Sequence, residues 1–156
     1  MIDKQQLCAF LVRAKKSTYA AGDKANKKIE QDFSTSLLYT EWDWIYHDNY
    51  FGGEPYGGRE VVLFKNKPIY IMAYYWFLQE HISDIKSIYA FLQHALSLIP
   101  EQYPYRGPKT YDEDNLSYLN TFVWEINNFS GEEIITQDGK EIYKAKYIGG
   151  FVDQRK

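Results

Sequence analysis

The chain has 156 residues and a formal net charge of −3 at neutral pH, and 45% of its residues are hydrophobic. This length and composition suit one globular domain that buries its own core without a disulfide or a structural metal ion. The acidic balance argues against nucleic acid as the main partner, because binding to phosphates requires a basic face.

An amphipathic helix is predicted from Asp3 to about Lys16. Its apolar stripe at helical spacing consists of Leu7, Phe10, Leu11 and Ala14. Asp3 and Gln6 fit a capping pair at the first turn of this helix. The polar stretch 22–36 has no periodicity, and it predicts a long loop.

Segments that alternate with a period of two predict β-strands after this loop. In the first of them, Trp42, Trp44 and Tyr46 share one face. A later strand is apolar on both faces, with Tyr70, Met72, Tyr74 and Trp76 on one face and Ile69, Ile71, Ala73 and Tyr75 on the other. Either a helix covers the second face, or this strand contacts another subunit.

A second amphipathic helix is predicted over residues 84–99. Ser83 is its expected N-cap, and Pro100 ends it. A further strand is predicted within residues 116–127, where apolar and polar residues alternate.

Two segments of the chain repeat one residue pattern. In the first segment the pattern consists of Glu60, Val61, Val62, Lys67, Ile69, Tyr70 and Tyr74. In the second it consists, at identical spacing, of Glu133, Ile134, Ile135, Lys140, Ile142, Tyr143 and Tyr147. Upstream, Trp44 and Tyr46 are matched with Phe122 and Trp124, and the two predicted helices correspond to each other.

The repeat predicts an α+β fold made of two tandem modules related by internal pseudo-symmetry. Each module consists of a helix followed by a three-stranded antiparallel meander. Module one covers about residues 3–78 and module two about residues 83–152, within a single domain of residues 1–156.

Under this alignment, module one carries the additional residues 54–58 between its first two strands. One interpretation is a long hairpin loop, and the other is a flexible lid over a pocket. The glycines near this segment do not lead into a helix, so the context of a phosphate-binding loop is missing.

The sequence contains no pattern for a metal or cofactor site. His47, His81 and His94 are far apart in the chain, and no cysteine cluster accompanies them. Cys8 is the only cysteine, which favours a reducing compartment. The first residues do not resemble a signal peptide, and no apolar run approaches the roughly 20 residues that span a bilayer. We therefore expect a cytoplasmic protein with no cofactor and no membrane partner.

Glu60 and Glu133 are the most informative acids, because they occupy equivalent positions of the repeat. If a pseudo-two-fold axis relates the modules, the two carboxylates approach each other among aromatic rings. Burial beside a like charge raises the pKa of a carboxyl group, and acids of this kind are suited to proton transfer. Alternatively, each acid caps its strand or pairs with Lys67 or Lys140.

Arg106 lies in the stiff connection 103–108 that follows the second helix. Its guanidinium can clamp a carboxylate or a phosphate. It can equally bind backbone carbonyls and hold the two halves of the chain together, and the sequence leaves both interpretations open.

Four motifs resemble an uncharacterised bacterial domain family. They are FLVRAKKSTY (10–19), YFGG (50–53), PYRGP (104–108) and GEEII (131–135). Members of that family occur alone or C-terminal to helix-turn-helix regulators of the Cro/repressor type, which implies by analogy that the domain senses a small molecule or a partner. The resemblance implies no catalytic residues. This chain has no helix-turn-helix, and its STSLL (34–38) replaces a stretch where the family pattern leads one to expect an aspartate before the leucine.

The leading hypothesis is a small-molecule-binding or sensing module, without catalysis, whose aromatic-lined pocket lies between the two halves. The residues expected to contact the ligand are Trp42, Trp44, Tyr46, Tyr70, Tyr74, Arg106, Trp124, Tyr143 and Tyr147. One alternative is a protein-interaction or inhibitory module that uses the apolar strand at 69–76, for instance in a homodimer. The other is an acid–base enzyme that uses Glu60 and Glu133.

Overall fold

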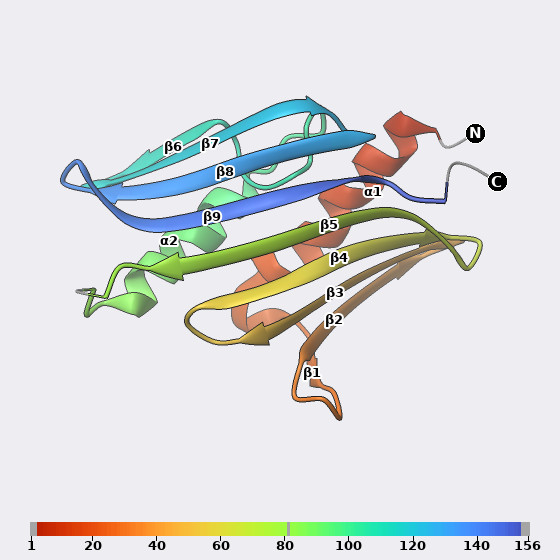
Figure 1. Ribbon diagram of the computed structural model, residues 1–156, viewed down its shortest axis with the longest axis horizontal. Coiled ribbons are helices and arrows are strands. Elements are labelled where there is room, and N and C mark those ends of the chain that lie inside the picture. Colours follow the sequence, from red (N-terminus) through yellow and green to blue (C-terminus); the bar gives the residue numbers. More distant parts are fainter. Residues whose placement is uncertain (1–2, 81, 154–156) are drawn as a thin grey trace.

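The computed structural model describes residues 3–80 and 82–153. These residues form one antiparallel sheet of nine strands, and both α-helices pack against the same face of it (Figure 1). The strand order is β1-β2-β3-β4-β5-β9-β8-β7-β6, so β5 and β9 are neighbours in the middle. The strands are β1 (Lys27–Ile29), β2 (Thr35–Glu41), β3 (Trp44–Gly52), β4 (Tyr56–Phe64), β5 (Lys67–Leu78), β6 (Thr110–Glu113), β7 (Leu116–Glu125), β8 (Asn128–Gln137) and β9 (Lys140–Phe151).

The predicted fold class is wrong in its division into two modules. The meanders β3–β4–β5 and β7–β8–β9 do not fold as separate units, because β5 and β9 pair from Tyr70 opposite Phe151 to Leu78 opposite Tyr143. The backbone hydrogen bonds of this central pair join the two meanders into one sheet. Strands β1, β2 and β6 extend its edges, so the fold is dominated by a single sheet.

The two predicted helices are confirmed. Helix α1 spans Lys4–Ser17, and Asp3 caps it by accepting hydrogen bonds from two amides of its first turn. Helix α2 spans Ile85–Ser97, and its N-cap is Asp84 in place of the predicted Ser83. In the described ranges, no helix has both the length and the apolar character needed to cross a membrane.

The stretch 22–36 is not the loop that was expected. It contains the end of a 3₁₀ segment, η1 (Tyr19–Lys24), together with β1 and the start of β2, and β1 pairs with β2 at the edge of the sheet. All of β1 is exposed, so no alternation between buried and exposed residues marks it in the sequence. Trp42 lies in the β2–β3 turn with a φ of 56°, and its side chain is 97% exposed.

The strand registers correct the alignment between the two meanders. Tyr46 faces Val62 across β3 and β4, while Tyr118 faces Ile135 across β7 and β8. Because Val62 and Ile135 are matched in the repeat, Tyr46 corresponds to Tyr118 and not to Trp124. The same registers place the polar residues of the two meanders at corresponding positions of the sheet.

The segment 54–58 is not an insertion. Residues 53–55 form the turn between β3 and β4, and residues 56–58 belong to β4. Within this turn, Glu54 accepts a hydrogen bond from Leu78 N at 2.6 Å and another from the hydroxyl of Tyr89 on α2. The turn is therefore tied to the end of β5 and to α2.

Tyrosine rings form much of the core between the helices and the inner face of the sheet. The largest fully buried side chains are Trp76, Tyr46, Tyr70, Tyr118, Tyr143, Phe10 and Phe129. A buried tyrosine hydroxyl needs a hydrogen-bond partner, so a core of this composition must also contain polar groups.

No helix covers the outer face of β5 in the part of the chain that the structure describes. Tyr75 is 56% exposed and Phe77 is 36% exposed, and Ile148 on the adjacent β9 is 62% exposed. The interpretation that a helix covers this face is therefore wrong. Contact with another subunit stays a prediction.

Gly58 provides a test of how closely β3 and β4 approach each other. A Cβ atom at Gly58 would lie 2.3 Å from Asn49 O and 2.6 Å from Tyr50 Cβ, which are positions that cannot move without displacing β3. We expect Gly58→Ala to lower the free energy of unfolding by about 1–3 kcal/mol, measured by urea denaturation. Gly53→Ala is the matched control, because nothing lies within 4 Å of its Cβ position. Equal stability of the two variants would contradict this strand geometry.

Candidate functional site

A cluster of polar side chains lies buried between the helices and the inner face of the sheet. We call it the buried polar cluster. It consists of Lys15, Asp48, Glu60, Arg106, Asn120 and Glu133, with the hydroxyl groups of Tyr46, Tyr74, Tyr118, Tyr143 and Tyr147. Each of the six non-tyrosine residues is at most 7% exposed.

Glu133 on β8 is the most fully bonded member of the cluster. Arg106 donates to its Oε1 from Nε at 2.9 Å and from Nη2 at 2.7 Å. Tyr118 donates to Oε2 at 2.5 Å and Tyr143 to Oε1 at 2.8 Å. Both oxygens of this buried carboxylate are thus satisfied by charged or phenolic donors, as burial requires.

Asn120 on β7 connects this ion pair to the connection after α2. It accepts a hydrogen bond from the Tyr147 hydroxyl at 2.6 Å and donates to Gly107 O at 3.1 Å. Gly107 N in turn donates to the Tyr118 hydroxyl at 3.0 Å. These bonds fix the backbone next to Arg106, so the position of the guanidinium is set by β7 as well as by β8.

Glu60 on β4 has a cation from α1. Lys15 Nζ lies 2.7 Å from Glu60 Oε2, and it donates to Tyr105 O at 2.5 Å. The Glu60 oxygen and the hydroxyl of Tyr46 nevertheless have no partner at regular hydrogen-bond geometry in the described residues. Burial lowers the pKa of Lys15 despite the nearby carboxylate. This half of the cluster is therefore less completely bonded than the half around Glu133.

Asp48 on β3 is a second acid beside Glu60, which it faces across β3 and β4. It accepts a hydrogen bond from the Tyr74 hydroxyl at 2.6 Å. The pKa of Asp48 is raised to about 7, mainly by burial and secondly by the negative charge of Glu60. A carboxyl group of this kind changes its charge close to neutral pH.

The space inside the cluster is small. A cavity of about 20 Å3 lies among Lys15, Tyr19, Tyr46, Glu60 and Arg106. This volume fits a single water-sized group. The cluster is therefore closed to larger molecules in this conformation.

Most of the residues predicted to bind a ligand come together around this cluster. They are Tyr46, Tyr70, Tyr74, Arg106, Tyr143 and Tyr147, and the two acids Glu60 and Glu133 lie with them. The three tryptophans lie elsewhere. Trp42 and Trp124 are 97% and 69% exposed, and Trp44 packs its ring against Phe10 and Phe64.

Sequence reasoning missed Lys15, Asp48, Asn120 and Tyr118. Three of them are related by the strand registers of the structure, which match Tyr46 with Tyr118 and Asp48 with Asn120, but the sequence alignment did not contain these matches. Lys15 has no signal in the sequence, because it belongs to the basic end of α1 and is 45 positions from its partner in the chain. His81 lies outside the described residues, and within them no three His, Cys, Asp or Glu side chains could hold a metal ion.

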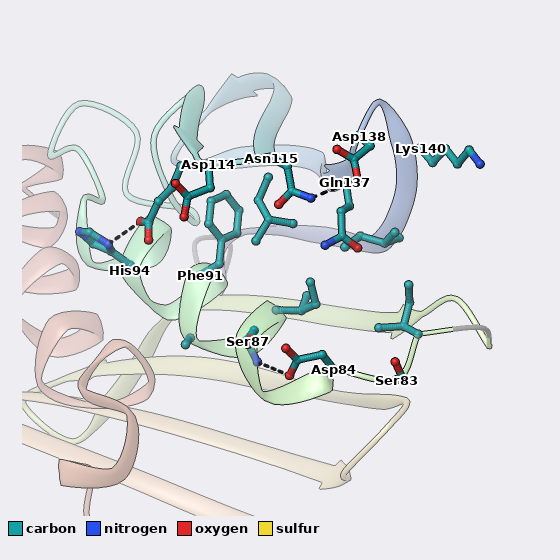
Figure 2. Close-up of a pocket in the computed structure, with 16 residues that line it drawn as sticks. Ser83, Asp84, Ser87, Phe91, His94, Asp114, Asn115, Gln137, Asp138 and Lys140 are labelled. Carbon is teal, nitrogen blue, oxygen red and sulfur yellow. Dashed lines mark hydrogen bonds and ion pairs between the residues drawn. The ribbon is translucent and has the colours of Figure 1, made fainter.

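A ligand-sized hollow lies to one side of the cluster, between α2 and the β6–β7 and β8–β9 turns (Figure 2). We call it the α2 groove, and its volume is about 960 Å3. Its apolar floor consists of Ile82, Ile88, Phe91, Leu116 and Ile142. Binding sites for small molecules combine such a floor with a few polar groups at the rim.

Carboxylates dominate the rim of the α2 groove. They belong to Asp84, Glu113, Asp114 and Asp138. His94 Nδ1 lies 3.3 Å from Glu113, and Lys140, the one lysine of the lining, extends away from the hollow in Figure 2. The groove therefore presents negative charge above an apolar floor.

The ion pair between Arg106 and Glu133 gives a test of the cluster. We expect Arg106→Met to lower the free energy of unfolding by about 3–5 kcal/mol, because it leaves Glu133 buried without its cation. Arg13→Met is the matched control, since Arg13 and Glu41 form a pair of the same 2.7 Å length near the surface. The control should lose at most about 1 kcal/mol in urea denaturation. Similar losses in both variants would show that the cluster is not closed to water.

Residues 48–152 match the family described as "Domain of unknown function (DUF5680)". The matched part contains Asp48, Glu60, Arg106 and Glu133 of the buried polar cluster, as well as the α2 groove. Comparison with curated proteins and with solved structures finds no match. Because the match covers more than half of the chain, this protein belongs to DUF5680, an uncharacterised domain family as the sequence resemblance predicted.

Proposed function

We propose that this protein is a small-molecule-binding module and that the α2 groove holds the ligand. The observation that carries the proposal is the size and lining of the groove, about 960 Å3 with a floor of aliphatic and aromatic side chains. Pockets for small molecules have volumes of roughly 300–1,000 Å3. The aromatic pocket expected between the two halves is too small for this role in the closed conformation, with about 20 Å3.

The groove favours a ligand with an apolar body and a cationic group. Ile82 and Leu116 are partly exposed and present apolar atoms to a ligand body, and Ile88, Phe91 and Ile142 are buried beneath the groove. Asp114 makes no hydrogen bond or ion pair with the other described residues, so its carboxylate is available to a ligand. An ammonium group placed at this rim would gain charge-assisted contacts without displacing an internal partner.

A sensing role fits such a module. The sequence resembles domains that occur alone or behind regulators of the Cro/repressor type, and a domain in that position reports on a ligand to its fused or separate partner. We propose that this chain works in the cytoplasm, in line with its single cysteine. Neither catalysis nor a cofactor is part of this proposal.

Binding of a hydrophobic cation tests the proposal. We expect benzylammonium, whose N–H groups can donate to the rim carboxylates, to shift the amide signals of α2 and of the β6–β7 turn in ¹H–¹⁵N NMR spectra. Benzenesulfonate, of similar size and opposite charge, should shift them much less, because the rim repels it. Ser87→Trp places an indole in the groove and should weaken binding at least about tenfold.

Lys86→Trp is the control for this substitution, because Lys86 is exposed on the same helix and does not line the groove. It should bind the cation as the unmodified chain does. No shift with any cation, or equal binding by the Ser87 variant, would rule out the α2 groove as the site.

A second candidate function is a protein-interaction module, and the outer face of β5 favours it. Tyr75 and Phe77 are exposed there beside Ile148, and exposed aromatic side chains on a flat surface are common in protein interfaces. We propose a homodimer as the form to look for.

Sedimentation equilibrium at high micromolar concentration tests this second candidate. If the outer face is an interface, Tyr75→Glu should shift a dimer towards the monomer, because it removes an exposed aromatic ring from the contact and adds a charge that loses water there. Ile29→Glu, at the exposed edge strand, should leave the distribution unchanged. A monomer at every concentration would contradict the homodimer.

A further inference from the structure

The buried polar cluster contains one more carboxyl group than it has cationic groups. Lys15 and Arg106 are its cations, and Asp48, Glu60 and Glu133 are its acids. With every group ionised, the cluster would carry one uncompensated negative charge where water has little access. Such a charge is costly to bury, and a buried acid usually responds by keeping its proton.

The extra acid is Asp48, and the corresponding residue in the other meander shows that its charge is not needed for packing. Asp48 faces Glu60 across β3 and β4, as Asn120 faces Glu133 across β7 and β8. Asp48 accepts from Tyr74 at 2.6 Å, and Asn120 accepts from Tyr147 at the same distance. The amide of Asn120 therefore satisfies the equivalent tyrosine without a charge. The carboxyl group of Asp48 can in addition bind and release a proton, which an amide cannot do.

The groups around Asp48 belong to five different parts of the fold. They are Tyr46 on its own strand, Glu60 on β4, Tyr74 on β5, Lys15 on α1 and Arg106 after α2. Burial and the charge of Glu60 raise the pKa of Asp48 to about 7, and the hydrogen bond from Tyr74 and the two cations oppose this rise. Proton binding at this position is therefore balanced near neutral pH.

The small cavity adjoins this acid pair. Tyr46 is fully buried and Glu60 is 3% exposed, and the Tyr46 hydroxyl and Glu60 Oε2 have no partner at regular hydrogen-bond geometry among the described residues. Both residues line the cavity of about 20 Å3, which Tyr19 and Ala20 of η1 close. A water molecule fits this volume and would give the Tyr46 hydroxyl a partner and Glu60 Oε2 a second one beside Lys15.

We propose that Asp48 and Glu60 form a binding site for one exchangeable proton, with a water molecule in the adjoining cavity joining Glu60 to Tyr46. When the proton is bound, the two cations and the two remaining carboxylates of the cluster balance. When the proton leaves to solvent, the two facing acids repel each other. Because Lys15 and Tyr19 also contact this site, the repulsion acts on the packing of α1 and η1 against the sheet. The site is separate from the α2 groove and does not depend on the function proposed for it.

Carbon-detected NMR of the side-chain carboxyl groups tests the proton site directly. Between pH 4.5 and pH 8.5, we expect one aspartate signal to titrate near pH 7. Asp48→Asn should abolish this transition. Asp43→Asn, an exposed aspartate in the β2–β3 turn, should leave it unchanged. If every acidic side chain titrates below about pH 5.5, as ordinary carboxyl groups do, the proposal is wrong.

Stability gives an independent measurement. The folded chain keeps the Asp48 proton up to about pH 7, whereas an ordinary aspartate loses it near pH 3.8. Between pH 3.8 and about pH 7 the folded state binds more protons than the unfolded state, so the free energy of unfolding falls as pH rises. Above about pH 7 the contribution of Asp48 no longer changes with pH. In urea denaturation, the unfolding constant of the unmodified chain relative to Asp48→Asn should rise by up to roughly tenfold per pH unit across this window. Parallel profiles for the two proteins would overturn the proposal.

Tyr74→Phe provides a second test of the proton site, which applies even if Asp48→Asn folds poorly. The Tyr74 hydroxyl donates to the ionised form of Asp48, so its removal should move the near-neutral transition to higher pH. An unchanged or lower transition would show that Asp48 is not the group that holds the proton.

Discussion

The fold depends on satisfying five buried ionisable groups beneath the helices. Within the buried polar cluster, the partners of each ion pair come from different parts of the fold: Lys15 from α1 and Glu60 from β4, Arg106 from the connection after α2 and Glu133 from β8. Removing one partner would leave a charge in a nearly dry environment, so arrangements that shift a helix relative to the sheet are disfavoured. The cluster thus specifies where the helices sit, whether or not it adds net stability.

The high tyrosine content follows from the same constraint. The chain has fifteen tyrosines, and five of their hydroxyls belong to the buried polar cluster, those of Tyr118, Tyr143 and Tyr147 among them. A tyrosine ring packs like other aromatic side chains, while its hydroxyl supplies the donor that a buried carboxylate needs. The aromatic content therefore serves the core first. The α2 groove, where a ligand has room, has Phe91 as its one aromatic side chain in the described lining.

Local patterns in the sequence predicted the two helices and identified two acids of the buried polar cluster. Both kinds of pattern can be read from residues that lie close together in the chain. Helical spacing and the cap at Asp3 identified α1, and the repeat singled out Glu60 and Glu133. The partners of these acids could not be found in this way, since Arg106 and Glu133 meet only when α2 and the sheet pack together, 27 positions apart in the chain.

Turns and edges were harder to predict for a different reason. Trp42 and Trp124 have positive φ angles of 56° and 68° and are exposed, although hydrophobicity alone suggests an inward strand face. The edge strand β1 has no buried face and so leaves no periodic signal. The alignment of the two meanders failed at their first strands, where it matched Tyr46 with Trp124 although the registers match Tyr46 with Tyr118.

The pairing of β5 with β9 has a consequence for how the chain is made. During synthesis, β5 leaves the ribosome long before β9, since the two strands are separated by α2 and three further strands. Until β9 arrives, β5 is an unprotected edge whose backbone groups and apolar side chains can pair with other nascent chains. A strand that is translated well after β5 therefore closes the middle of the sheet.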